Sequence, residues 1–97
     1  MQKRDTDRAE VVTIRGKRIE IGMHADDLFE LVSQRELVGQ TIVPDRNNPP
    51  NLQFVKYYRI DDRDFAIELR KSSRYAPYTV TSILVDPAGV RPAAARQ

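Results

Sequence analysis

The 97-residue sequence has no cysteine, one histidine and only four glycines. Without cysteine the chain can form no disulfide, no thiolate nucleophile and no cysteine metal site. One histidine and scattered serines leave little material for a nucleophile with a base, and there is no glycine-rich phosphate loop. No apolar run approaches the roughly 20 residues needed to span a bilayer. We therefore expect no enzyme, no cofactor and no transmembrane span.

Two acidic clusters could in principle bind a metal ion. One is His24 with its neighbours Asp26 and Asp27, and the other is the group of aspartates in the segment 61–64. The first has the composition of a solvated first helical turn. The second lacks the glycine and the closing glutamate of a calcium-binding loop. We expect no metal site at either place.

The charge of the chain is nearly balanced. Sixteen basic residues stand against fourteen acidic ones, so the formal net charge is +2, and the pI near 9.2 comes from this small surplus. Nucleic-acid binding requires a concentrated basic face rather than a high pI. The first ten residues are charged and lack the apolar segment of a secretory signal, which fits a cytoplasmic protein or an exported domain without its signal.

The distribution of apolar residues predicts one domain between two tails. Residues 1–10 and 91–97 show no hydrophobic period and are expected to be disordered. Residues 11–90 carry the apolar patterns and form a single α+β domain.

A short amphipathic helix is the central predicted element. Ala25, Leu28, Phe29 and Val32 recur at the spacing of one helical face, and two aspartates favour its first turn. The helix, or a second short one after it, extends to about residue 36, and Gly39 supplies the stop.

The strand patterns predict two hairpins and a further strand. Val11–Ile14 and Lys17–Ile21 pair through a turn at Arg15-Gly16. Leu52–Ile60 and Asp64–Lys71 form the clearest hairpin, and Tyr78–Val85 follows as a third main strand. Between helix and sheet, residues 40–51 contain Pro44 and a Pro-Pro pair and are expected to form a long loop, with at most a brief strand within it.

Together these elements predict an α+β fold in which one or two short helices pack on a three- to four-stranded antiparallel sheet. A core this small offsets the chain entropy narrowly, so the domain is expected to be marginally stable or a homo-oligomer. The expected core residues are Ile19, Ile21, Leu28, Phe29, Val32, Phe54, Ile60, Phe65, Ile67, Leu69, Val80 and Leu84, or their neighbours in the sheet.

The candidate binding residues are aromatic and basic. Tyrosine and arginine are enriched at protein interfaces, and cations interleaved with aromatic rings also suit single-stranded nucleic acid. The leading hypothesis is a non-enzymatic module that binds another protein. The alternative is a cytoplasmic nucleic-acid-binding or regulatory domain that uses the 70–78 segment. The candidate contacts are Tyr57, Arg59, Arg70, Lys71, Arg74, Tyr75 and Tyr78, with the 40–51 loop beside them.

The order helix, hairpin, strand resembles the SmpA/OmlA (BamE-like) small lipoproteins of bacterial outer membranes, over about residues 19–90. The residues that carry the resemblance are Gly22-Met23, Leu28, Tyr57-Tyr58, Phe65–Leu69, Val80–Val85 and Gly89. The sequence departs from the family at His24, where Ser or Thr is usual, and lacks the lipid-bearing cysteine. The resemblance implies a β-lactamase-inhibitor-like fold and envelope proteins as partners. It would place the protein at the periplasmic face of the outer membrane; without it a cytoplasmic location is expected.

Overall fold

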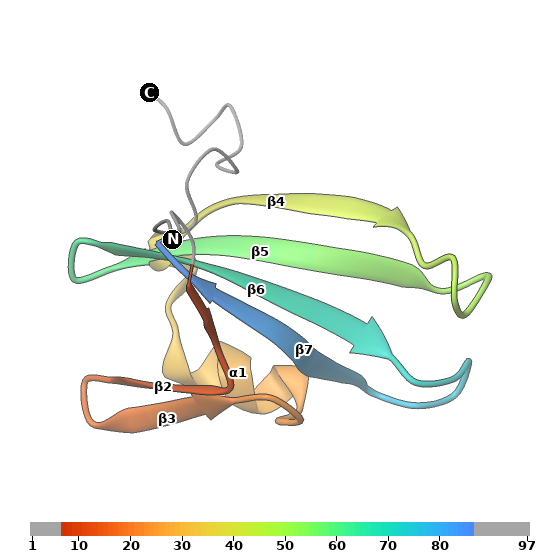
Figure 1. Cartoon of the computed structure of the whole chain (residues 1–97), viewed down its shortest axis with the longest axis horizontal. Helices are drawn as coiled ribbons and strands as arrows, with labels where there is room; N and C mark the ends of the chain where they lie inside the picture. The colour runs from red at the N-terminus through yellow and green to blue at the C-terminus, as the bar shows by residue number, and fades with distance from the viewer. Residues whose placement is uncertain (1–6, 87–97) are drawn as a thin grey trace, which may run out of the picture.

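The computed structural model describes residues 7–86 of the chain, and strands dominate this part (Figure 1). The elements in order are β1 (Asp7–Ala9), β2 (Val11–Ile14), β3 (Lys17–Glu20), α1 (Ala25–Leu31), the 3₁₀ helix η1 (Gln34–Glu36), β4 (Leu37–Pro44), β5 (Leu52–Ile60), β6 (Arg63–Lys71) and β7 (Tyr78–Val85).

Five of the strands form one antiparallel sheet in the order β1-β7-β6-β5-β4. Strands β4, β5, β6 and β7 lie side by side in sequence order, as a meander, and β1 pairs with β7 at the far edge. Strands β2 and β3 form a separate two-stranded sheet. This hairpin and α1 lie on the same side of the large sheet (Figure 1).

The α+β class predicted from the sequence, with three or four strands, is wrong. The structure is 57% strand and 13% helical, with a five-stranded and a two-stranded sheet. The error arises chiefly at Leu37–Pro44, where the sequence pattern predicts a helix end followed by a loop. This segment is strand β4, because β5 offers it a partner over its whole length. The N-terminal hairpin packs on the face of the sheet and does not extend it.

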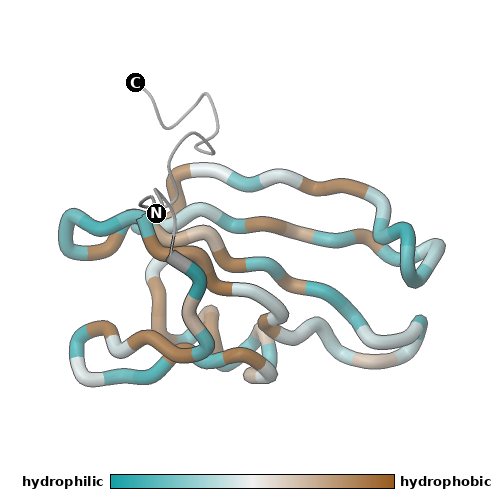
Figure 2. The backbone as a smooth tube through the Cα atoms, viewed as in Figure 1, coloured by the Kyte–Doolittle hydropathy of each residue, from teal (hydrophilic) through white to brown (hydrophobic). Residues whose placement is uncertain are grey.

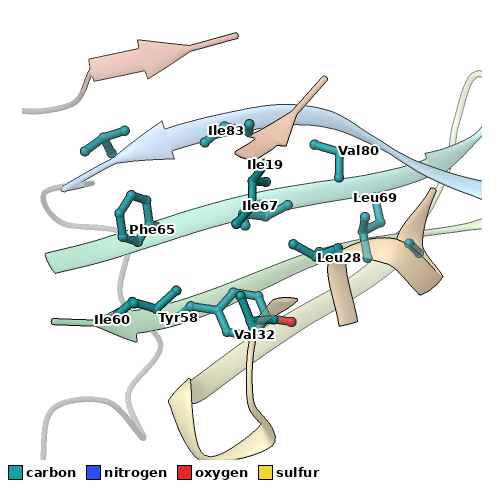
Figure 3. Close-up of a cluster of buried hydrophobic side chains, with 12 residues drawn as sticks. Ile19, Leu28, Val32, Tyr58, Ile60, Phe65, Ile67, Leu69, Val80 and Ile83 are labelled. Carbon is teal, nitrogen blue, oxygen red and sulfur yellow. The ribbon is translucent and has the colours of Figure 1, made fainter. Parts of the chain in front are cut away.

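One face of the large sheet, here called the core face, holds the hydrophobic core. Ile19 from the hairpin and Leu28 and Val32 from the helical segment cover it. The close-up in Figure 3 shows them against Ile67, Leu69 and other side chains of the sheet. The buried apolar residues are Ile19, Ala25, Leu28, Val32, Tyr58, Ile60, Phe65, Ala66, Ile67, Leu69, Val80, Ile83 and Val85.

A β-bulge in β7 decides which of its side chains reach the core. The register of β6 and β7 shifts between Glu68 and Leu69, and such a shift moves the following side chains to the opposite face. Val80 and Ile83 therefore both point inward and are fully buried. Leu84, which strict alternation from Val80 would bury, lies opposite Ala66 on the other face and is only partly buried.

Three further residues expected in the core are more exposed than predicted. Ile21 follows the end of β3, at the turn made by Gly22, and is exposed. Phe29 lies within α1 at the border of its buried face, and its side chain is 45% exposed. Phe54 is only partly buried, since the helix does not reach over that end of β5.

Two hairpins are closed by tight turns with positive φ. Arg15 and Gly16, with φ of 52° and 81°, close the β2–β3 hairpin as predicted. Asp61 and Asp62 also have positive φ and join β5 to β6. Positive φ at both central residues is typical of the hairpin turn whose twist matches the flanking strands.

Both predicted tails extend beyond the described residues. Asp7–Ala9, assigned by sequence to the N-terminal tail, forms β1 and pairs with residues 83–85 of β7. Residues 1–6 and 87–97, and with them the predicted tail 91–97 and the resemblance at Gly89, lie outside the described part.

Candidate functional site

The part of the core face that α1 leaves uncovered carries a connected set of aromatic and lysine side chains. We call it the aromatic–lysine surface. Its members come from α1, from the end of β4 and the first half of β5, from the end of β6 and from the start of β7. They are Phe29, Ile42, Leu52, Phe54, Lys56, Lys71 and Tyr78.

Contacts link these side chains in a chain of alternating cations and rings. The Lys56 ammonium lies 5.5 Å from the ring centroid of Phe29 and 5.8 Å from that of Phe54. The rings of Phe54 and Tyr78 meet edge to face, with centroids 5.2 Å apart. The Lys71 ammonium lies 5.0 Å from the Tyr78 ring centroid. Cation–π contacts of this kind hold the lysine ammonium and the aromatic ring in place. Both groups stay accessible at the surface.

Apolar residues of the edge extend the surface. Ile42 pairs across the strands with Phe54, and residues directly opposite in an antiparallel pair share a face. Leu52 lies beside Tyr78, whose hydroxyl donates to the Leu52 carbonyl oxygen at 3.3 Å. Ile42 and Leu52 are 48% and 43% exposed. Exposed apolar side chains gathered on one face are typical of interaction sites.

The two lysines of the surface, Lys56 and Lys71, have no carboxylate at ion-pair distance within the described part of the chain. The Lys56 ammonium donates to Oε1 of Gln40 at 2.7 Å, and partial burial lowers the pKa of Lys56 below its usual value. A partner carboxylate would relieve this desolvation cost.

A small cleft adjoins the aromatic–lysine surface where the helix meets β4 and β5. Its volume is about 110 Å³, and Phe29, Lys56 and Tyr58 contribute to its wall. An apolar cavity of roughly 150 Å³ holds a benzene molecule, so this cleft has room for about one small side chain. It is much smaller than the roughly 300–1,000 Å³ of sites for drug-sized ligands.

The structure divides the sequence-predicted contact residues between two faces. Lys71 and Tyr78 belong to the aromatic–lysine surface, because they pair with each other on the core face of β6 and β7, before the bulge in β7. Tyr57 and Arg59 lie on the opposite face of β5, where Tyr57 pairs with Ala66. Arg59 forms an ion pair with Asp64 at 3.0 Å.

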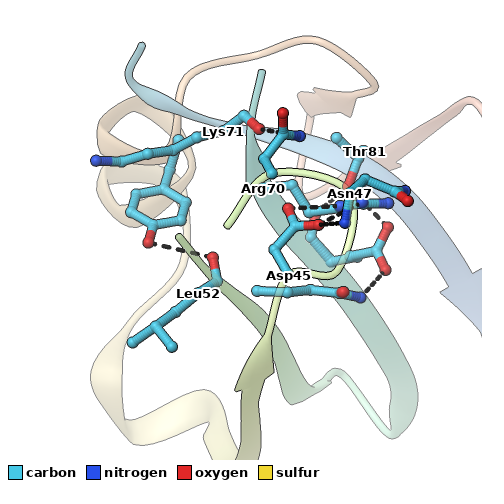
Figure 4. A network of polar contacts seen from close by, with 10 residues as sticks. Asp45, Asn47, Leu52, Arg70, Lys71 and Thr81 are labelled. Carbon is cyan, nitrogen blue, oxygen red and sulfur yellow. Dashed lines mark hydrogen bonds and ion pairs between the residues drawn. The ribbon is translucent and has the colours of Figure 1, made fainter. Parts of the chain in front are cut away.

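Arg70 is engaged with a buried carboxylate. Its guanidinium donates to both carboxylate oxygens of Asp45, at 2.8 and 3.2 Å, and Asp45 is 1% exposed. Asp45 also accepts the backbone N–H of Asn47, and Asn48 donates to the Lys71 carbonyl oxygen (Figure 4). These contacts bind the 45–51 segment, the remainder of the predicted 40–51 loop, to the end of β6.

The remaining two predicted contacts lie on the connection between β6 and β7. Tyr75 is 89% exposed, and the Arg74 guanidinium lies 6.0 Å from the centroid of its ring. They lie shortly before Tyr78, the first residue of β7, but outside the contacts that link the aromatic–lysine surface.

The sequence pattern did not indicate Phe29, Leu52, Phe54 and Lys56 as contact residues, whereas Ile42 lies within the predicted 40–51 contact segment. A signal for one of them was present: Lys56 shares its side of the strand with Phe54, Tyr58 and Ile60. The charged end of a lysine must reach water or a polar partner. A lysine within an apolar stripe therefore indicates that the stripe is covered at one end only. The pairing of β4 with β5, which the sequence pattern does not reveal, supplies the rest.

The two acidic clusters lie at the start of α1 and at the turn from β5 to β6. His24 precedes α1 and makes no side-chain capping hydrogen bond. Among the described residues, no group of three potential ligands has the geometry to hold a metal ion. The described helices, of seven and three residues, are too short to cross a bilayer, which takes roughly 20 residues.

Comparison with protein-family models, with curated proteins and with solved structures finds no significant match.

Proposed function

We propose that this chain is a non-enzymatic module that binds another protein through the aromatic–lysine surface. The observation that carries the proposal is the continuous row of rings and lysines from Phe29 to Lys71. Phe29 is exposed, and the other four side chains of the row are half-buried. Aromatic side chains at the centre of an interface, with charges around them, account for most of the binding energy in many complexes.

The charge and shape of the surface favour one kind of partner. Two lysines without carboxylate partners in the described part of the chain attract acidic residues. The exposed apolar side chains and the side-chain-sized cleft favour apolar anchors on the same partner. The partner would therefore present apolar side chains next to aspartate or glutamate. The resemblance to BamE-like lipoproteins implies that envelope proteins are the class to search first.

The nucleic-acid alternative has less support from the geometry. Stacking of bases requires an open ring face, whereas a lysine ammonium already lies over one face of Phe29, Phe54 and Tyr78. Arg70, one of the three cations proposed for that role, is paired with Asp45. Oligonucleotide binding is the second outcome that the experiment distinguishes.

Charge reversal on the surface tests the proposal. The variant K56E/K71E should retain the circular dichroism spectrum and lose most of the proteins captured specifically by the immobilised wild type from an extract of the source cells. The matched control K17E/R46E changes the net charge equally at exposed positions outside the surface and should retain capture. Equal capture by both variants would contradict the proposal.

A parallel titration with a fluorescent single-stranded oligonucleotide separates the two hypotheses. A protein-binding module should show weak binding that K56E/K71E and K17E/R46E change alike. Tight binding that falls steeply with salt and is lost only in K56E/K71E would instead support the nucleic-acid hypothesis.

A further inference from the structure

Strand β4 is a long edge strand without charge. It spans eight residues, Leu37–Pro44, and contains no Asp, Glu, Lys or Arg. Its side chains from residue 40 onward are exposed, and Ile42 and Val43 present apolar groups on opposite faces. Figure 2 shows this apolar stretch on the outermost strand of the sheet. Edge strands normally carry charges or prolines that prevent pairing with another chain.

Features that disfavour pairing with another strand occur only at the two ends of β4. A bulge interrupts the register between Leu37 and Gly39, and Pro44, which has no N–H, ends the strand. The five residues between them, Gly39–Val43, pair regularly with β5 on one side. On the other side no described strand pairs with them. Their outward backbone groups can accept another strand.

The opposite edge of the sheet is unsuited to such pairing. Strand β1 has three residues, two of which are Asp7 and Arg8. A short charged edge resists pairing, so β4 of one molecule has no suitable β1 to bind on the next. Pairing between unlike edges would build open chains of molecules, whereas pairing of one edge with itself closes after two copies.

We propose that two copies of this chain associate through their β4 strands. The strands pair antiparallel, so both five-stranded sheets join into one continuous sheet about a twofold axis near Thr41. Thr41 then lies opposite its own copy, Gly39 opposite Val43, and Gln40 opposite Ile42. A small residue faces a β-branched one, threonine pairs with threonine, and no like charges meet.

Self-pairing also explains the composition of the strand better than pairing with a charged segment. A second copy brings the same uncharged side chains, so the interface leaves no ionised group without a partner. The twofold axis is perpendicular to the sheet and keeps both core faces on one side. Ile42 of each copy therefore approaches the other, which shields exposed apolar area that the monomer leaves in water.

The mass in solution tests this pairing. Sedimentation equilibrium of the wild type should give twice the 11.2 kDa of the chain. The variants T41K/V43K and T41E/V43E place charges on the exposed side of the edge, away from the core face. Each should be a monomer with an unchanged circular dichroism spectrum, because like charges meet at Thr41. An equimolar mixture of both should recover the dimer.

Three results would overturn the proposal: a monomeric wild type at the highest soluble concentration, a dimer that both charged variants retain, or a mixture that stays monomeric. Hydrogen exchange gives a second readout that needs no variant. Protection of the amides in residues 39–43 should rise with wild-type concentration, while protection in β1 should not. The inference does not rest on the proposed function. The variant K56E/K71E changes no residue of β4, so it should lose partner binding and still form the dimer.

Discussion

At the scale of single residues, burial and pairing have set the properties of two groups on opposite faces of the sheet. Asp45 is a fully buried carboxylate that survives in the fold because Arg70 supplies two hydrogen bonds to it. Buried charges are tolerated only when they are paired in this way. Tyr58 is a buried phenol on the core face, 3% exposed. Both groups make stability depend on pH, at opposite ends of the scale.

Asp45 is expected to contribute to unfolding in acid. The hydrogen bonds from Arg70, and then from the backbone of Asn47, hold the pKa of Asp45 below its usual value. Because the folded state has the lower pKa, its stabilising contribution is complete above about pH 4, the pKa of an unfolded aspartate. It is lost as the pH falls through the lower folded value.

The variant D45N should therefore be less stable than the wild type at neutral pH, and the difference should shrink in acid. Urea unfolding of both proteins at neutral pH and at about pH 3 measures it. A difference that stays constant between the two conditions would show that the carboxylate charge is not what stabilises the loop.

Tyr58 is expected to make the fold less stable in alkali. Burial, with the nearby charge of Glu36 as a smaller cause, raises the pKa of Tyr58 to about 12. An unfolded tyrosine ionises near pH 10, so the unfolded state loses its proton first. The free energy of unfolding should fall as the pH rises from about 10 to about 12, by about 1.4 kcal/mol per pH unit at most.

The variant Y58F should lack this component. Thermal unfolding across the alkaline range compares the two proteins, and the wild-type curve should fall away from that of Y58F only above about pH 10. Parallel curves would mean that the phenol is accessible to water in the folded state.

At the scale of elements, the helix shows how far tertiary contacts outweigh local signals. Helix α1 has seven residues, no side-chain cap from His24 and no basic residue in its last turn. A helix this short is not stable alone in water. It is held by burial of Leu28 and its neighbours against the sheet, whereas the adjacent Phe29 points out over Lys56.

Leu28 and Phe29 form a matched pair for testing this account. L28A removes a fully buried side chain and should lower the free energy of unfolding by about 3 kcal/mol, through lost transfer energy and a cavity. F29A removes a larger but 45% exposed side chain and should cost about 1 kcal/mol or less. Urea unfolding measures both, and a larger loss for F29A would contradict the assignment of Phe29 to the surface.

At the scale of the whole molecule, two exposed parts of the large sheet underlie the two proposals. The α1 helix and the β2–β3 hairpin cover only part of one face of a five-stranded sheet (Figure 1). The uncovered end leaves Phe54 and Tyr78 accessible beside two lysines. Strand β4 is an open edge for a separate reason, since no described strand pairs with its outer side. Binding of a partner at the face and of a second copy at the edge would each bury what the single chain leaves exposed.

The sequence by itself determined the elements whose signals are local. The turn at Arg15-Gly16, the Leu52–Ile60 and 64–71 hairpin, and the inward side of β6 follow from turn chemistry and alternation, which neighbouring residues decide. For the candidate site, it identified Lys71 and Tyr78, because a cation beside an aromatic ring is visible in a short segment.

Tertiary structure alone decided the features that depend on partners distant in sequence. Strand β4 forms because β5 pairs with it, the bulge in β7 decides that Ile83 and not Leu84 faces the core, and the reach of α1 decides that Phe29 and Lys56 meet at the surface. The partner of Arg70 is likewise Asp45, from a loop 25 residues earlier. Such contacts carry no local period, since each depends on the register in which separate strands meet.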